Sequence, residues 1–175
     1  MRICPICHSQ YEPKYSSMQP TCNNFMCMGK HSTQKRVKKD ANKKRSAFNQ
    51  TDVRYWHSRV RSECHKYIRE RDKGLGCISC GTISGQMQAG HYKPGTHSIT
   101  RYDVENIHGQ CARCNNRKSG NLTEYRPALI AKIGLSKVEY LESANGVRKW
   151  TIDDLKLELA KFKRLNKDLK NDKGV

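Results

Sequence analysis

The sequence has few acidic residues and no long hydrophobic run. Among its 175 residues, 16 Asp and Glu stand against 34 Lys and Arg, which gives a formal charge of +18. An excess of this size implies a polyanionic partner. No stretch is long and apolar enough to span a membrane, and the start, MRICPICHSQ, lacks the hydrophobic region of a signal peptide. We therefore expect an intracellular, cytoplasmic protein without a membrane partner.

Apolar residues are scarce as well. They make up 35% of the chain, so the hydrophobic core must be modest and bound metal would supply the missing stability. The most basic segment has no bulky apolar face opposite its lysines, and a membrane-surface helix needs such a face. A nucleic acid is therefore the favoured partner over a lipid surface.

Cysteines are numerous for a chain of this length. Eight of the nine cysteines fall into four close pairs, and Cys64 is left over. In a chain without a signal peptide, such pairs are typical of zinc sites and not of disulfides. A secreted disulfide protein would rarely repeat the close spacing four times. Two four-thiolate zinc sites are predicted: Cys4, Cys7, Cys22 and Cys27, and Cys77, Cys80, Cys111 and Cys114.

Three domains are predicted from composition. Segment 1–32 is an N-terminal zinc-finger-like unit, with His8 and His31 as substitute ligands and a disordered tail with reactive thiols as the alternative. Segment 33–51 is a basic arm that lies along phosphates or serves as a solvated linker. Segment 52–175 carries helices and the chemistry. The basic residues of the arm are Lys35, Arg36, Lys38, Lys39, Lys43, Lys44 and Arg45.

Helices are predicted on both sides of the second cysteine group. A helix over 52–71 begins at the N-cap Asp52, and its apolar stripe includes Cys64 as a core residue. A short helix covers 127–133. Ser136 with Glu139 predicts a capping box for the next helix, which ends at 145–146, and Thr151 with Asp154 predicts one for the last. These helices are expected to pack, not to react.

The stretch 77–120 organises the rest of the chain. Two Cys-x-x-Cys turns bracket it and would close a tetrahedral zinc, which makes that zinc structural. Between them, 86–92 and 104–110 are predicted strands, and 111–118 is a predicted helix. The fold class is therefore a small zinc-stabilised α+β protein, with a ββα core and flanking helices. A frame pinned by metal can hold catalytic residues in place.

The order of residues in this stretch resembles the HNH (His-Me finger) endonucleases in their zinc-knuckle form. The matching features, besides the four cysteines, are His91, Asn106, Asn115 and Lys118. A longer match, IRERDKGLGCISCGT, AGHY, NIHGQCARCNNRKSGNL and WTIDDL, resembles the phage NinG (Rap) recombination proteins and covers most of 53–155. The resemblance implies a phage or prophage protein in a bacterial host cell.

What the resemblance implies is a hydrolase, a structure-selective DNA endonuclease that cleaves branched recombination intermediates such as Holliday junctions. His91 would be the general base and Asn106 would hold its loop. Asn115 would ligate a catalytic Mg²⁺ or Mn²⁺ ion. Phosphate contacts would come from Arg113, Arg117 and Lys118. The resemblance also allows a homodimer and contacts with other recombination proteins.

One position departs from the HNH pattern. The residue before the catalytic His is often a metal ligand in that family, and here it is Gly90. His108 is the first choice as its replacement, because strand alternation places it on the face of Asn106. Other candidates are His97, Asp103, Glu105 and Asn116.

Two other functions compete with the nuclease as interpretations of the sequence. A non-catalytic zinc module that binds DNA or RNA is the alternative, with Gly90 as the sign of lost activity. A zinc nucleobase deaminase is disfavoured, because it needs His-x-Glu around an open zinc and here Tyr92 and Lys93 follow His91.

Overall fold

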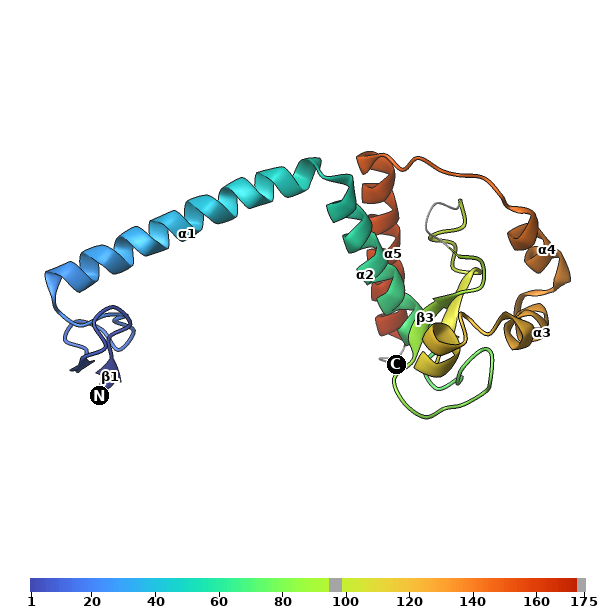
Figure 1. The fold of residues 1–175 in the computed structure, drawn as a ribbon, viewed down its shortest axis with the longest axis horizontal. Coiled ribbons are helices and arrows are strands. Elements are labelled where there is room, and N and C mark those ends of the chain that lie inside the picture. The colour runs from blue at the N-terminus through green and yellow to red at the C-terminus, as the bar shows by residue number, and fades with distance from the viewer. Residues whose placement is uncertain (95–98, 173–175) are drawn as a thin grey trace. The chain divides into compact units, whose positions relative to one another are not determined.

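The computed structural model describes residues 1–94 and 99–172. It combines helices with two small two-stranded sheets and divides into two compact units, Met1–Thr51 and Asp52–Val175. Figure 1 shows the helices and strands of each unit. Among the described residues, no helix has the length and apolar character needed to cross a membrane.

The first unit is a small ribbon and a long helix. Strands β1 (Arg2–Ile3) and β2 (Gln10–Tyr11) pair antiparallel, and helix α1 spans Phe25–Thr51. The helix therefore runs through the predicted boundary at residue 32 and includes the basic arm. The reason lies at its start, since Cys27 of the first cysteine group is buried in the first turn of α1.

The second unit is built on two packed helices, α2 (Val53–Arg71) and α5 (Ile152–Asp172). Apolar residues recur at three- and four-residue spacing on each, which gives each helix one buried stripe. The helices and the hairpin share one core cluster, made of Val60, Cys64, Ile68, Ala89, Tyr102, Ile107, Leu155, Leu159 and Phe162. Cys64 is fully buried there, as predicted.

The hairpin of this unit is formed by β3 (Gln88–His91) and β4 (Ile107–Gln110). The strands are antiparallel, with Gln88 opposite Gln110 and Gly90 opposite His108. Both strands are shorter than the predicted 86–92 and 104–110. Alternation places Ala89 and His91, with their partners Gly109 and Ile107, on the face toward α2. The other face carries Gln88, Gly90, His108 and Gln110.

A buried carboxylate ties the end of α2 to the hairpin. Asp72 accepts hydrogen bonds from the Arg71 guanidinium at 2.8 Å, from Gly109 N at 2.8 Å and from Lys132 Nζ at 3.1 Å. Burial by itself raises the pKa of Asp72, but the hydrogen bonds and charge of Arg71, with Gly109 and Lys132, lower that pKa to about 2.

The segment after β4 differs from the predicted α-helix. The five residues Arg113–Arg117 form a π-helix, η1, with Lys118 N bonded to Arg113 O at 3.0 Å. Such wide turns are rare and often occur at functional sites. The turn begins within the cysteine knuckle, because Asn115 N still bonds to Cys111 O at 2.9 Å.

Two short helices, α3 (Leu122–Ile133) and α4 (Leu135–Ser143), pack with Tyr92 around a second apolar cluster. The Ser136 capping box is wrong: Gly134, with φ of 89°, ends α3 and is the N-cap of α4, which has no side-chain cap. The Thr151 capping box is confirmed, since Asp154 N donates to Thr151 Oγ1 at 3.1 Å and Thr151 N donates to Asp154 Oδ2 at 3.0 Å. Asp52 is confirmed as the cap of α2 by the bond from Arg54 N to its Oδ1, 2.9 Å.

Candidate functional site

Both predicted cysteine groups are assembled in the structure. Within each group, all four sulfur atoms lie within 4.8 Å of one another. The distances from Cys7 Sγ to Cys22 Sγ and from Cys80 Sγ to Cys111 Sγ are both 3.8 Å, and all nine cysteines are free. Zinc–sulfur bonds of about 2.3 Å in a tetrahedron separate the sulfurs by about 3.8 Å. Each group could therefore hold a zinc ion.

The N-terminal group is closed by its own backbone turn. Cys4 N donates to Ser9 O at 2.9 Å and His8 N donates to Cys4 O at 2.8 Å. Among the metal-binding side chains of the described residues, this group contains the four cysteines and neither His8 nor His31. A zinc ion bound here would therefore have the four predicted cysteines as ligands, without the substitutes.

The second group is joined to the hairpin. Ile78 N, in the first knuckle, donates to Gly109 O of β4 at 2.9 Å. Cys114, in the second knuckle, accepts on its sulfur from Asn121 Nδ2 at 3.6 Å. The knuckles thus fix the far end of the hairpin and the start of η1, as a structural site would.

His91 is held in one tautomer by the backbone. Its Nε2 lies 3.0 Å from Arg101 O, which can only accept, so Nε2 carries the proton and Nδ1 keeps its lone pair. Burial lowers the pKa of His91 below its ordinary value, and the positive charge of Arg101 adds to this, while the bond to Arg101 O opposes it. The ring is therefore a neutral base at pH 7.

A second histidine adjoins it. The rings of His65, on α2, and His91 meet edge to face with centroids 6.3 Å apart. Burial lowers the pKa of His65 to about 4, with the charge of His91 and two nearby arginines as further causes. His65 was not predicted as a site residue, although it lies one helical turn from Arg61 and from Arg69 and off the apolar stripe.

Asn106 is a buried clamp on the segment that follows His91. Its Oδ1 accepts from Lys93 N at 2.8 Å, and its Nδ2 donates to Lys93 O at 3.0 Å and Thr100 O at 3.1 Å. The side chain is fully buried. Asn106 therefore holds Lys93 and Thr100 in place, and its side chain has no exposed surface for a substrate.

His108 lies in a different environment from the one predicted. It does share the hairpin face of Asn106, but α3 covers that face. The ring is 1% exposed and its Nδ1 is 3.2 Å from Tyr125 Oη. Tyr125 Oη in turn donates to Gly90 O at 3.2 Å. Among the described residues, His108 belongs to no group of three or more His, Cys, Asp or Glu side chains. It is therefore placed as a buried partner of Tyr125.

The other predicted replacements for the ligand at position 90 are dispersed. Asp103 accepts from Glu105 N at 2.9 Å, and Glu105 forms an ion pair with Lys137. Asn116 is exposed on η1. His97 lies outside the described residues. Among the described residues, neither Asp103 nor Glu105 belongs to a group of three or more His, Cys, Asp or Glu side chains.

Three carboxamides surround Gly90 instead. Asn115 Nδ2 donates to Gln88 Oε1 at 2.7 Å. Gln110 Nε2 donates to Ser79 Oγ at 2.7 Å and to Gly120 O at 2.6 Å. A Cβ atom on Gly90 would lie 1.9 Å from Gln110 Oε1 and 3.0 Å from Asn115 Oδ1. Gln88 and Gln110 were not predicted from the sequence. The signal that could have found them is strand alternation, which places both on the same hairpin face as Gly90.

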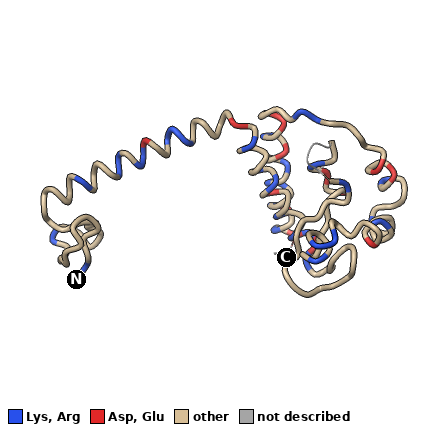
Figure 2. The backbone as a smooth tube through the Cα atoms, viewed as in Figure 1, with Lys and Arg blue, Asp and Glu red and all other residues tan. Residues whose placement is uncertain are grey.

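Each unit carries exposed cations. The side chains of Arg113, Arg117 and Lys118, on and after η1, are exposed. In the first unit, α1 carries eight Lys and Arg and one acidic residue, Asp40. Figure 2 shows these cations along much of the helix, and residues 46–51 at its end carry none. All seven predicted arm residues are exposed, so a polyanion could contact α1 from several sides.

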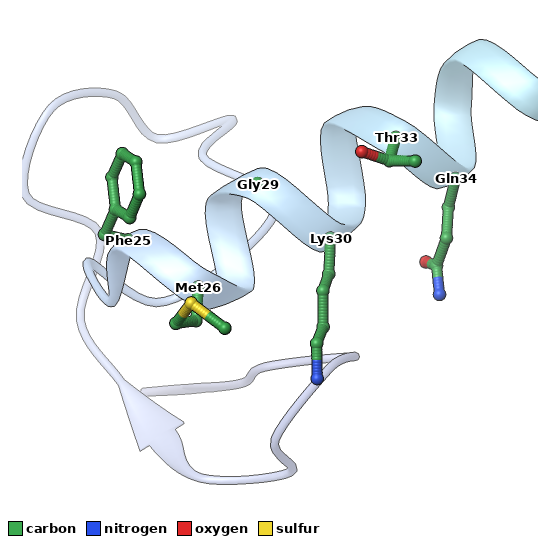
Figure 3. A pocket seen from close by; sticks show the side chains of 6 residues that line it. All are labelled: Phe25, Met26, Gly29, Lys30, Thr33 and Gln34. Carbon is green, nitrogen blue, oxygen red and sulfur yellow. The ribbon is translucent and has the colours of Figure 1, made fainter.

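A shallow hollow lies beside the first turns of α1. Figure 3 shows its lining, which is Phe25, Met26, Gly29, Lys30, Thr33 and Gln34. The lining offers no carboxylate, imidazole or thiolate, so we assign it no chemistry.

Known proteins resemble most of the chain. The family model described as Bacteriophage Lambda NinG protein matches residues 1–172. Protein ninG of Escherichia phage 933W is 35% identical over 198 residues, which cover 99% of this chain and 96% of that protein. Protein ninG of Escherichia phage lambda is 42% identical over 122 residues, 69% of this chain and 60% of that protein. No solved structure matches the chain significantly.

Proposed function

Because the chain belongs to the NinG family, we propose that it is a divalent-metal-dependent DNA endonuclease that cleaves branched recombination intermediates. In this proposal the stretch 77–120 is an HNH-like ββα core, with β3 and β4 as its strands and η1 as its helix. The second cysteine group is its structural zinc site. The protein would act in the cytoplasm of a bacterium that carries the phage or prophage.

The observation that carries the proposal is the state of His91. The bond from Nε2 to Arg101 O leaves Nδ1 as a free base, and burial keeps the ring neutral at pH 7. A general base for phosphodiester hydrolysis needs both properties. An ordinary surface histidine has neither a fixed tautomer nor a lowered pKa.

The chemistry follows from this arrangement. A water oxygen attacks the phosphorus atom, and its proton passes to His91 Nδ1. The bond from phosphorus to the leaving sugar oxygen breaks, and that oxygen takes up a proton from solvent. A divalent cation would supply electrostatic stabilisation of the developing negative charge. Asn106 bonds to Lys93 and Thr100, and its bond to Thr100 O would keep the next residue's carbonyl, Arg101 O, in position for His91.

Binding to DNA is assigned to the exposed cations. Arg113, Arg117 and Lys118 would contact phosphates next to the bond that is cut. The lysines and arginines of α1 would contact phosphates farther along the duplex. These contacts are independent of base sequence, so selectivity would come from DNA shape.

The test compares four-way, nicked and linear duplexes with Mg²⁺, with Mn²⁺ and with a chelator. Binding is followed by mobility shift and cleavage by denaturing gel. We expect all three DNAs to bind and the four-way substrate to be cut only with metal. Binding of all three without cleavage under any condition would refute the nuclease and would favour the alternative, a non-catalytic DNA- or RNA-binding zinc module.

A further inference from the structure

Gly90 is not required by its own backbone conformation. Six glycines in the described chain have positive φ, and Gly90 is not among them. An L-amino acid could therefore adopt its backbone angles. What excludes a side chain is the carboxamide of Gln110, whose Oε1 would lie 1.9 Å and whose Cδ would lie 2.7 Å from a Cβ atom. The space of the missing side chain is thus filled by Gln110.

The Gln110 amide has a fixed orientation and an unsatisfied oxygen. Its Nε2 donates to Gly120 O, which is an acceptor only, so the amide cannot be flipped. Its Oε1 is buried and has no hydrogen-bond partner within the described part of the chain. A buried acceptor without a partner destabilises the folded protein, so its retention needs an explanation.

A second amide oxygen faces the same space. Asn115 Nδ2 donates to Gln88 Oε1, and this directs Asn115 Oδ1 to the opposite side, toward Gly90. Asn115 lies on the π-helix and Gln110 at the end of β4. Two carbonyl oxygens from separate elements therefore converge where the family pattern would place a side-chain ligand.

We propose that Gln110 supplies the oxygen ligand that Gly90 lacks, so that Gln110 Oε1 and Asn115 Oδ1 together bind the divalent cation. The inference rests on the proposed function, because it assigns ligands to the cation of that reaction. Amide oxygens suit Mg²⁺ and Mn²⁺, which prefer hard oxygen donors. Since neither amide is charged, the site binds the free cation weakly and gains further oxygens from DNA phosphate.

The test is Mn²⁺ binding to the zinc-loaded full-length protein, followed by electron paramagnetic resonance and by calorimetry without DNA. Gln110→Ala is expected to weaken Mn²⁺ binding at least tenfold. Ser79→Ala is the matched control, because it removes one bond to Gln110 Nε2 and leaves Oε1 in place. The control should bind Mn²⁺ like the wild type.

A ligand exchange separates coordination from packing. In the double variant Gly90→Asp with Gln110→Ala, the new carboxylate enters the space that Gln110 leaves and should restore binding to wild-type affinity or better. The double variant Gly90→Ala with Gln110→Ala places a methyl group without an oxygen in that space, and it should not restore Mn²⁺ binding. Melting temperature and zinc content verify that each variant is folded.

The outcomes separate the inference from the proposed function. Wild-type Mn²⁺ affinity in Gln110→Ala, or equal binding by the two double variants, would overturn the assignment of Gln110. If Gln110→Ala does not fold, Asn115→Asp decides: it adds a charge at the site and should tighten Mn²⁺ binding at least tenfold, and unchanged affinity overturns the proposal. If Gln110→Ala weakens Mn²⁺ binding but the wild type cuts no DNA, the result supports the cation site and refutes the nuclease proposal.

Discussion

Replacing Asp72 by Asn should destabilise the second unit strongly, although the change adds no bulk. The carboxylate is 4% exposed and joins Arg71, Gly109 and Lys132, so it connects α2, β4 and α3. Its pKa is about 2 in the folded protein. Against about 3.9 in an unfolded chain, the difference corresponds to about 2.6 kcal/mol at pH 7. Arg71 and Lys132 would also lose their anionic partner.

The pH dependence has a definite sign. Because folding lowers the pKa of Asp72, its contribution is complete above about pH 4 and is lost as the pH falls toward 2. The free energy of unfolding is measured from urea denaturation, followed by circular dichroism. Asp72→Asn should lose about 2–3 kcal/mol at pH 7 and clearly less at pH 3.

Asp153→Asn is the matched control. Asp153 forms an ion pair with Lys156 on α5, but its side chain is 87% exposed, so its loss should change stability by less than about 1 kcal/mol. Equal effects of the two substitutions at pH 7 would refute the view that Asp72 is a buried junction. An effect of Asp72→Asn that grew at pH 3 would refute the pKa argument.

Three further predictions concern charge, zinc and pH. Replacing Lys38, Lys39, Lys43 and Lys44 by Ala should lower the slope of log affinity against log salt for duplex DNA by up to about 4, and an unchanged slope would show that α1 does not bind DNA. Cys80→Ser should reduce the zinc content from about two to about one per chain and abolish DNA cleavage, and retention of both zinc ions would contradict the four-sulfur site. Because burial lowers the pKa of His91, the rising limb of the pH–rate profile for cleavage should lie below pH 6.5, and a limb above pH 7 would contradict that shift.

The features that the sequence predicts well are those with local causes. Close cysteine spacing predicts both four-sulfur groups, because a Cys-x-x-Cys turn sets its own geometry. Helix α2 and its cap follow from apolar periodicity and from Asp52. The start of α5 follows from Thr151 and Asp154, which bond to each other across one turn. Each of these depends on residues a few positions apart.

The features that the sequence does not predict depend on packing between distant segments. Strand alternation predicted His108 as a metal ligand. In the structure α3 covers that face of the hairpin, and His108 Nδ1 forms a hydrogen bond with Tyr125 Oη. Gly90 and Gln110 lie 20 positions apart, on two different strands. Only the folded structure shows that the Gln110 side chain fills the space that a side chain at position 90 would occupy. Ser136 failed as a cap because Gly134 already ends one helix and begins the next.

The most direct test of the account is single-turnover cleavage of a four-way DNA junction already bound by the protein, started with Mn²⁺, for wild type and His91→Ala. A positioned general base contributes about 10²–10⁴-fold. We predict a loss of at least about 100-fold in the cleavage rate for His91→Ala, with junction affinity and zinc content unchanged. Cleavage by His91→Ala at the wild-type rate would contradict the assignment of His91 as the base.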